Sequence, residues 1–386
     1  MIAAEANVRV EIKPEILRWA IERSMIERDA LEARFPGLRA WESGQKKPTL
    51  KQVENFARAT HTPVGFLFLS EPPEERIPIP DFRTMRDARV RRPSPDLLDT
   101  IYLCQQRQDW FHDFAVGAGY DKRAFVGSIV PGAEVRTVAE TMRNQLAFST
   151  EARRQSPTWT DALRAFIQLA EDLGVLVMVS GVVGNNTHRN LDPEEFRGFA
   201  LVDDYAPLIF VNGADTKAAQ MFTLAHELVH VWSGRSGVVD ADVSAPPLGN
   251  ERWCNEVAAE LLVPLEEFRA ELREGVTLRI ELDRLARIFK VSTLVILRRM
   301  SDARYLTGDR YWTAYGEEVA LLRSIERKSG GNFYLTQPVR NSRRFTRALI
   351  ADTLEGNTLY RDAFRMLGVS TDATFRELSG KLGFVV

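Results

Sequence analysis

The spacing of apolar residues divides the chain into two helical parts that flank a short β-rich part. Residues 14–69, 96–120 and 135–174 carry apolar side chains at helical spacing. Two apolar and β-branched stretches follow, "GVLVMVSGVV" and "FRGFALVDDYAPLIFVN", and the second predicts a strand, a turn and a strand. Residues 279–300 and 317–386 return to the helical pattern. The pattern predicts an α+β fold that is mainly α and contains a small β-sheet.

Prolines and chain length indicate several domains. The segment "SEPPEERIPIPD" at residues 70–81 contains four prolines, which exclude a helix and favour an extended connector. A chain of 386 residues, 45% of them hydrophobic, can bury more than one core. We therefore predict four parts: an N-terminal helical domain at 1–70, the connector with helices at 71–135, a domain with the small sheet at 136–300, and a C-terminal helical domain at 301–386.

Charge and cysteine content narrow the class of protein. The formal net charge is only -2, so the chain as a whole has no strong attraction to nucleic acid or to a membrane surface. Its two cysteines, Cys104 and Cys254, are far apart in sequence, as in proteins of a reducing compartment. The N-terminal sequence resembles no signal peptide, and no apolar run reaches the roughly 18 residues of a membrane span. We expect a soluble, cytoplasmic protein with no membrane partner.

The segment "LAHELVHVWSG" at residues 224–234 has the spacing of a metal site. His226 and His230 lie one helical turn apart on the same face, so both imidazoles can point at one ion. Glu227 lies about 100° around the helix and can reach a water molecule beside that ion. The helix is expected to begin near Asp215 or Thr216 and to end at Gly234. The alternative is an ordinary helix with a solvated polar face. A third metal ligand nearby in the sequence would favour the metal site over this alternative.

The next predicted helix, "NERWCNEVAAELLVP", offers three carboxylates as that third ligand. A catalytic zinc normally keeps three protein ligands and one open position. The helical phase places Glu251 and Asn255 at the border of the buried face, whereas Glu256 and Glu260 point away from it and are expected to be solvated. Glu251 is the predicted ligand, and Asn255 is predicted to hydrogen-bond a ligating histidine. The rival ligands lie in the preceding loop: Asp240 and Asp242.

These two segments together resemble the ImmA/IrrE family of metallopeptidases, and the hairpin before them is similar as well. The resemblance spans roughly residues 140–300. It implies a gluzincin-like domain that binds zinc through His226, His230 and Glu251, with Glu227 as the catalytic general base.

Two further features of the substrate site are weaker predictions. Tyr205 and His188 are candidates for the group that stabilises the oxyanion. The segment "PLIFVN" either offers a free edge to an extended substrate or is a plain core strand.

The N-terminal segment "WESGQKKPTLKQVENFARA" resembles XRE-type helix-turn-helix domains, which implies a five-helix domain. It departs from that family because only "PGLRA" stands between Phe35 and Trp41, where the recognition helix should be. Residues 14–69 contain nine Lys and Arg against seven Asp and Glu, a small excess for a DNA-binding face. We expect weak DNA binding at most. The candidate contacts are Arg39, Lys46 and Lys47.

The C-terminal segment is more basic, with eleven Lys and Arg against six Asp and Glu in residues 321–386. It predicts three helices separated at Gly356 and Gly368. The order of the parts is similar to that of prophage and stress regulators. We therefore expect a cytoplasmic zinc endopeptidase that cleaves a specific protein, such as a repressor or an antitoxin. The alternative is a DNA-binding regulator or toxin–antitoxin component whose zinc domain senses or binds without cleaving.

Overall fold

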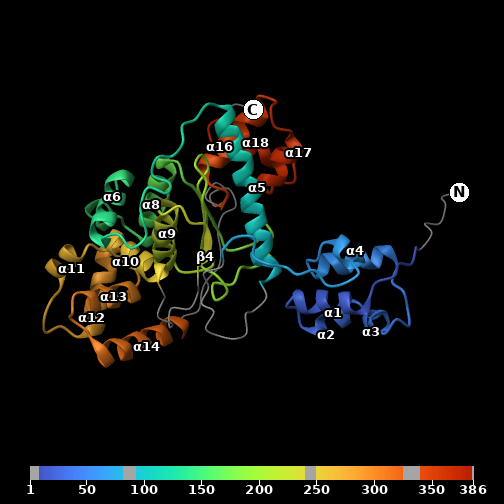
Figure 1. The fold of residues 1–386 in the computed structure, drawn as a ribbon, viewed down its shortest axis with the longest axis horizontal. Coiled ribbons are helices and arrows are strands. Elements are labelled where there is room, and N and C mark those ends of the chain that lie inside the picture. The colour runs from blue at the N-terminus through green and yellow to red at the C-terminus, as the bar shows by residue number, and fades with distance from the viewer. Residues whose placement is uncertain (1–7, 81–92, 240–248, 325–339, 385–386) are drawn as a thin grey trace. The chain divides into compact units, whose positions relative to one another are not determined.

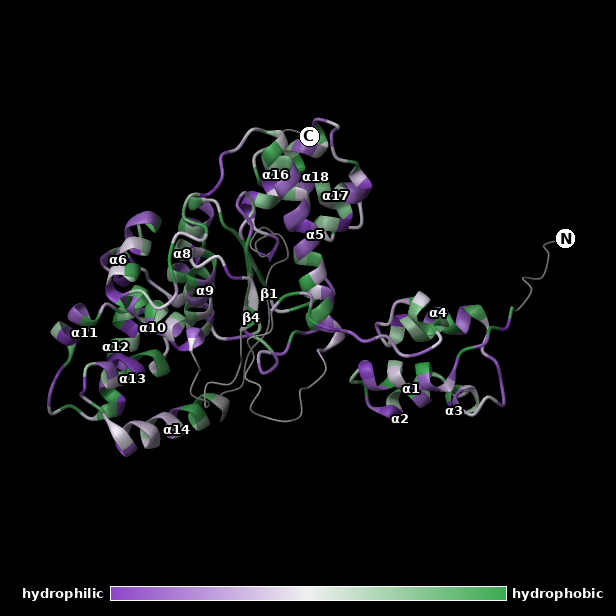
Figure 2. Cartoon of the chain, viewed as in Figure 1, coloured by the Kyte–Doolittle hydropathy of each residue, from purple (hydrophilic) through white to green (hydrophobic). Residues whose placement is uncertain are grey.

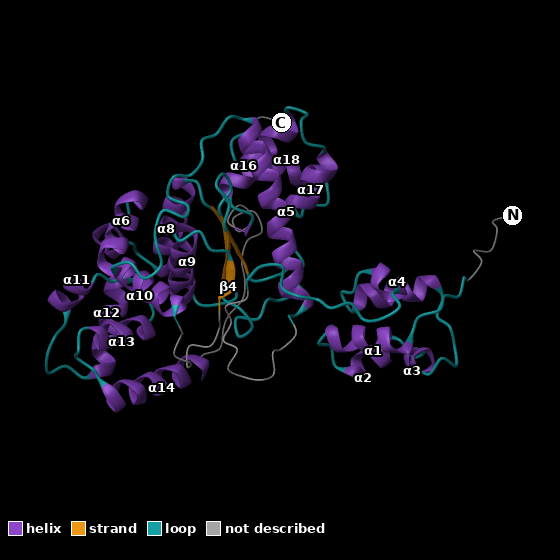
Figure 3. Cartoon of the chain, in the orientation of Figure 1, coloured by secondary structure: helices purple, strands orange, loops and turns teal. Residues whose placement is uncertain are grey.

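The computed structural model describes residues 8–80, 93–239, 249–324 and 340–384 (Figure 1). The chain falls into two compact units. The first comprises Met1–Pro78 with Asp87–Ile101, and the second comprises Ile79–Arg86 with Tyr102–Val386. The predicted fold class is confirmed, because the described residues form mostly helices and one small mixed sheet (Figure 3). Both domains predicted beyond residue 135, at 136–300 and 301–386, lie in the second unit. The boundary between them at residue 300 stays a prediction.

The first unit is a small helical domain. Its elements are α1 (Pro14–Arg23), α2 (Arg28–Arg34), α3 (Leu38–Glu42), α4 (Leu50–Ala59) and the 3₁₀ helix η1 (Val64–Phe68). Phe56 lies at the centre of the core, with its ring centroid 5.6 Å from that of Phe35 and 6.4 Å from that of Trp41. Thr49 and Gln52 form a capping box that starts α4. The five predicted helices are therefore present.

Two of the three candidate DNA contacts of this unit lie close to carboxylates. Helix α3, at the place of the recognition helix, has only five residues. The Arg39 guanidinium lies 2.7 Å from Glu32, and the Lys47 ammonium lies 2.6 Å from Glu11. Lys46 is exposed. Each neighbouring carboxylate offsets a positive charge that a phosphate would need, so weak DNA binding stays our prediction.

The second unit combines helices with a four-stranded sheet. Its elements before the sheet are α5 (Pro95–Gly117, which begins in the first unit), α6 (Val135–Leu146), α7 (Thr150–Arg154) and α8 (Trp159–Leu173). The sheet and its central helix are β1 (Leu176–Ser180), β2 (Gly198–Leu201), β3 (Leu208–Asn212), α9 (Lys217–Trp232) and β4 (Gly237–Val239). The later helices are α10 (Asn250–Leu262), α11 (Leu265–Glu271), α12 (Leu278–Phe289), α13 (Thr293–Asp302), α14 (Gly308–Ser324), α16 (Arg343–Leu354), α17 (Tyr360–Leu367) and α18 (Asp372–Lys381). Among the described helices, none combines the length and the apolar character needed to cross a bilayer.

The sheet has the strand order β1-β3-β2-β4. Strand β3 pairs in parallel with β1 and antiparallel with β2, and β2 pairs antiparallel with β4. Hydrogen bonds therefore occupy both sides of β3, the strand that contains "LIFVN". The prediction that this strand offers a free edge to a substrate is wrong, and its alternative, a core strand, is correct.

Helices cover both faces of this sheet. Ile209 and Val211 of β3 belong to the core shared with α8 and α9, while the alternate residues point to the opposite face. On that face, Arg107 and Gln108 of α5 contact the sheet, and the Gln108 amide donates to the Leu201 and Ala206 carbonyls. Figure 2 shows that the strands are mostly hydrophobic, as expected of a sheet buried between two layers.

The three C-terminal helices attach to this second layer, as the sequence predicts three helices there. Arg107 donates to the Met366 carbonyl at 3.0 Å, and the Asn185 amide donates to the Gly368 carbonyl at 2.6 Å. The Glu171 carboxylate of α8 accepts from the Ser342 hydroxyl at 2.5 Å and from the Arg343 backbone N–H at 2.9 Å. Glu171 therefore caps the first turn of α16 and ties it to α8.

Burial raises the pKa of Glu171 to about 7, although the hydrogen bonds from Ser342 and from the backbone oppose this shift. The folded protein thus binds this proton more tightly than the unfolded chain, whose carboxyl has a pKa of about 4.5. The stability that this group contributes is complete below about pH 4.5 and is lost as the pH rises through about 7.

Replacing Glu171 with the neutral Gln should therefore flatten the pH dependence of unfolding. We expect the Tm of Glu171→Gln to rise relative to wild type as the pH increases from about 5 to about 8, measured by scanning calorimetry. Glu377→Gln removes an exposed carboxylate from the same group of helices and should leave the wild-type slope unchanged. Parallel curves for wild type and Glu171→Gln would contradict the assignment.

Candidate metal centre

Helix α9, which carries the histidine pair, is buried along most of its length. The Thr216 side chain accepts from the Ala219 N–H and starts the helix, as predicted. From Gln220 to Trp232, nearly every side chain is buried, because α8, α10 and strands β2 and β3 surround this helix. A helix enclosed in this way holds its polar side chains in fixed positions away from bulk water.

The end of α9 is fixed by a neighbouring loop. Gly234 has a φ of 70°, a left-handed conformation that ends the helix as the sequence predicts. The N–H groups of Gly127 and Ile129 donate to the last carbonyls of the helix, those of Val231 and Trp232. The Trp232 indole N–H donates to the Gln145 side chain at 2.6 Å. These bonds fix the position of α9 along its own axis. They therefore also fix where His226 and His230 lie along that axis.

Three side chains from α9 and α10 meet in this interior. The Nε2 atoms of His226 and His230 lie 3.0 Å apart. A Glu251 oxygen lies 3.2 Å from Nε2 of His226, and the other lies 3.4 Å from Nε2 of His230. All three ligand atoms lie within 4.8 Å of one another. The structure thus brings together the three residues that the sequence analysis selected as ligands.

The donor set fits a divalent cation such as zinc. Two nitrogens that each bind an ion at about 2.1 Å cannot lie more than about 4.2 Å apart, and the two Nε2 atoms satisfy this limit. The set offers two imidazoles and one carboxylate, which is a composition of catalytic zinc sites. Both imidazoles are almost completely buried.

Electrostatics in the group favour a neutral His230 imidazole beside a charged Glu251 carboxylate. Burial lowers the pKa of His230, although the hydrogen bond to Glu251 opposes this effect. Burial raises the pKa of Glu251, but the hydrogen bonds and the charge interactions with His226 and His230 outweigh it and hold this pKa far below its usual range. Neutral imidazoles and an ionised carboxylate are the states in which these groups bind metals.

Glu227 is a completely buried carboxyl group beside the donor group. Neither of its oxygens has a hydrogen-bond partner among the described residues. Burial, and then the charge of Glu251, raise the pKa of Glu227. An unpaired buried carboxyl group destabilises a fold, so its presence here needs a functional reason.

Strand β2 makes room for this carboxyl group through Gly198, a residue that the sequence analysis missed. A Cβ atom at position 198 would lie 2.6 Å from the Thr223 side chain and 3.2 Å from Oε1 of Glu227. Only glycine allows β2 to approach α9 this closely. The available signal was a lone glycine inside the predicted strand "RGFALV", since such a glycine often marks a close approach of another group.

The far end of α10 is held by arginines from three other helices. The Glu260 carbonyl accepts from Arg143 at 2.7 Å, and the Leu262 carbonyl accepts from Arg153. The Glu260 carboxylate pairs with Arg299 and accepts from the Leu265 N–H. The prediction that Glu260 is solvated is therefore wrong, because α13 covers that side of α10.

Other predicted site residues have different surroundings. Glu256 pairs with Arg252 at 2.9 Å and lies away from the histidines, as the helical phase predicted. The described contacts include no hydrogen bond from Asn255 to Nδ1 of His226, and the role of Asn255 stays a prediction. The rival ligands lie outside the described residues: Asp240 and Asp242.

Neither candidate for oxyanion stabilisation makes a described contact with the metal group. Tyr205 lies in the turn between β2 and β3, with its ring centroid 5.3 Å from that of His112. Gly198, beside Glu227, is at the other end of β2. His188 is exposed in the loop between β1 and β2. Both assignments stay predictions.

The geometry separates Glu251 from Glu256 as a ligand. Glu251→Gln should lower the affinity for zinc by more than the roughly 10–100-fold that follows the loss of a residue that only hydrogen-bonds a ligand. Glu256→Gln, on the same helix, should retain zinc, because its carboxylate pairs with Arg252 instead. Zinc content after dialysis against a graded chelator series measures both, with circular dichroism to confirm folding. Loss of zinc in Glu256→Gln together with retention in Glu251→Gln would reverse the assignment.

Comparison with known families agrees with this geometry. Residues 170–301 match the family described as an IrrE N-terminal-like domain of the M78 peptidases. Residues 341–381 match a domain of unknown function (DUF8813), and neither match includes the N-terminal unit. Searches of curated proteins and of solved structures gave no match. Since the first match contains the complete donor group, residues 170–301 form a metallopeptidase domain of the ImmA/IrrE family, with His226, His230 and Glu251 as its metal-binding group.

Proposed function

We propose that this protein is a zinc-dependent endopeptidase that hydrolyses a peptide bond in a specific protein substrate. The observation that carries the proposal is Glu227, a fully buried carboxyl group without a hydrogen-bond partner among the described residues, beside the donor group. The two imidazoles and the carboxylate of that group support zinc as the metal.

Zinc held by these three residues would supply Lewis-acid chemistry, which activates water and polarises a carbonyl group. The protein supplies the proton transfers. One Glu227 oxygen accepts the proton of the attacking water and then delivers it to the nitrogen of the leaving amine. Gly198 leaves space beside Oε1 of Glu227, where the side chain of any larger residue would crowd this oxygen.

Binding without cleavage is the alternative function. A domain that only senses or binds zinc needs its ligands, but it does not need an unpaired buried carboxyl group, which destabilises the fold. The ion pairs of Arg39 and Lys47 also weaken the case for a regulator that acts mainly by binding DNA. A repressor or an antitoxin as the substrate rests on the similarity in the order of the parts to prophage and stress regulators.

Replacing Glu227 with Gln tests catalysis separately from metal binding. The amide keeps the size of the side chain but cannot accept a proton, so cleavage should fall by at least about 100-fold while zinc content stays at the wild-type level. Zinc-loaded wild type and variant are incubated with a cell extract, and new protein N-termini are identified by mass spectrometry. We expect a small set of N-termini that only the wild type produces.

His226→Ala serves as the control that loses zinc and activity together. The same N-termini at the same rate with Glu227→Gln would contradict the catalytic role of this residue. If zinc-loaded wild type produced no new N-termini, the result would favour the alternative in which the domain binds without cleaving.

A further inference from the structure

A pocket of about 670 Å³ lies between α5, α8 and α16, and its lining includes none of the metal-group residues. Phe111 and Phe114 of α5 and Tyr120 form its aromatic side. Arg343 and Arg347 line it from α16. Its volume falls within the roughly 300–1,000 Å³ of small-molecule sites.

The aromatic rings of this pocket hold two guanidinium groups in place. The guanidinium carbon of Arg344 lies 5.7 Å from the ring centroid of Phe111 and 5.9 Å from that of Tyr120. The Arg347 guanidinium lies 5.3 Å from the Phe384 ring and donates to the Leu382 carbonyl. Stacking on a ring orients a guanidinium and leaves its outward N–H groups available to an anion.

The charge of the lining favours an anionic ligand. Three arginines face two carboxylates, Glu171 and Asp172. Glu171 already accepts hydrogen bonds from Ser342 and the Arg343 backbone, and Asp172 accepts one from Gln168 at 2.7 Å. Arg343 is exposed, and no described residue accepts a hydrogen bond from its guanidinium. The charge of Arg343 also acts on the Glu171 carboxylate. With three arginines against two carboxylates, the lining still carries one positive charge more than it has negative charges.

We propose that this pocket binds a small planar aromatic anion, with its ring against Phe114 and Tyr120 and its negative group on Arg343 and Arg347. Aromatic walls select a planar ring, and guanidinium groups select a carboxylate, sulfonate or phosphate. The two features coincide at one site of sufficient volume.

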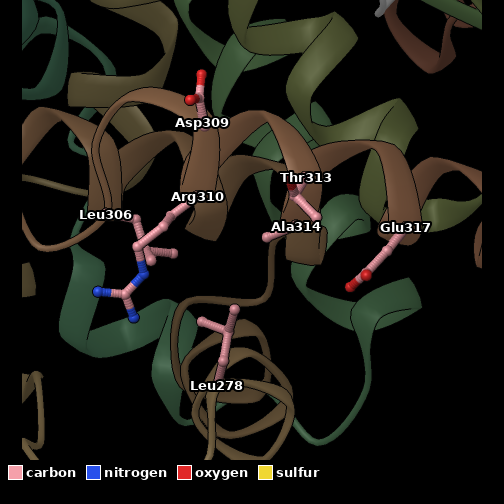
Figure 4. A pocket seen from close by; sticks show the side chains of 7 residues that line it. All are labelled: Leu278, Leu306, Asp309, Arg310, Thr313, Ala314 and Glu317. Carbon is pink, nitrogen blue, oxygen red and sulfur yellow. The ribbon is translucent and has the colours of Figure 1, made fainter.

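A second hollow, along α14, lacks this combination. Leu278, Leu306 and Ala314 form its apolar part, and Figure 4 shows Arg310 and Glu317 on the same side of the helix, with Asp309 pointing away. The described residues of its lining include one arginine, two carboxylates and no aromatic ring. Nothing in that hollow favours one ligand over another.

The test uses anilinonaphthalene sulfonate, an aromatic anion, and the uncharged phenylnaphthylamine as a matched probe with similar rings. Fluorescence titration of the full-length protein should show one saturable site for the sulfonate. Arg343→Gln/Arg347→Gln should weaken sulfonate binding by at least about tenfold and leave phenylnaphthylamine binding unchanged. Ala351→Phe, which fills the pocket and keeps all three arginines, should weaken both probes.

Arg361→Gln/Arg365→Gln is the control, since it removes two exposed arginines from α17 outside the pocket and should change neither affinity. Arg343→Gln alone leaves the Arg347 contact to Leu382 intact and separates loss of charge from disturbance of the C-terminal end. The proposal is overturned if no saturable site is found or if the control loses as much affinity as the pocket variants. It is also overturned if the arginine substitutions or Ala351→Phe leave sulfonate binding unchanged.

Discussion

The packing of α9 against α10 is the contact on which the metal centre depends. The histidines lie on one helix and Glu251 on the first turn of the other, so no donor group exists unless the two helices touch. Ala258 and Ala259 are buried small residues of α10, and their size allows a close approach. The contacts at the far end of α10, from Arg143, Arg153 and Arg299, then fix the axial position of this helix, and with it the height of Glu251.

This packing places polar groups where water does not solvate them. A buried polar group without a partner costs roughly 1–3 kcal/mol, and Glu227 is such a group among the described residues. The surrounding structure must therefore supply stability elsewhere: α9 is apolar over most of its surface, and the loop at Gly127 and Ile129 satisfies its last carbonyls. Burial of Glu227 lowers the stability of the fold and also serves its proposed chemistry. A poorly solvated carboxyl group accepts a proton more readily than a solvated one.

The sequence predicted the parts of this site that local periodicity determines. Four-residue spacing put His226 and His230 on one face, and helical phase separated Glu251 from Glu256. The prediction that Glu260 is solvated failed, because the helical phase describes α10 alone. It cannot show that α13 covers the other side of α10 and brings Arg299 to Glu260. The sequence also could not decide between an edge and a core position for β3, since strand order depends on contacts between distant segments. The aromatic pocket was not predicted for the same reason: α5, α8 and α16 are far apart in sequence.

The coordination of zinc in the full-length protein shows directly whether these three residues hold the metal. X-ray absorption at the zinc edge distinguishes nitrogen and oxygen ligands at about 2.0–2.1 Å from sulfur at about 2.3 Å. We expect one zinc with two imidazoles and a carboxylate and no sulfur, because burial, then the charges of Glu251 and Glu227, raise the pKa of the Cys254 thiol and keep it protonated. A zinc–sulfur distance in the spectrum, or fewer than two imidazole ligands, would contradict the assignment of His226, His230 and Glu251 as the ligands.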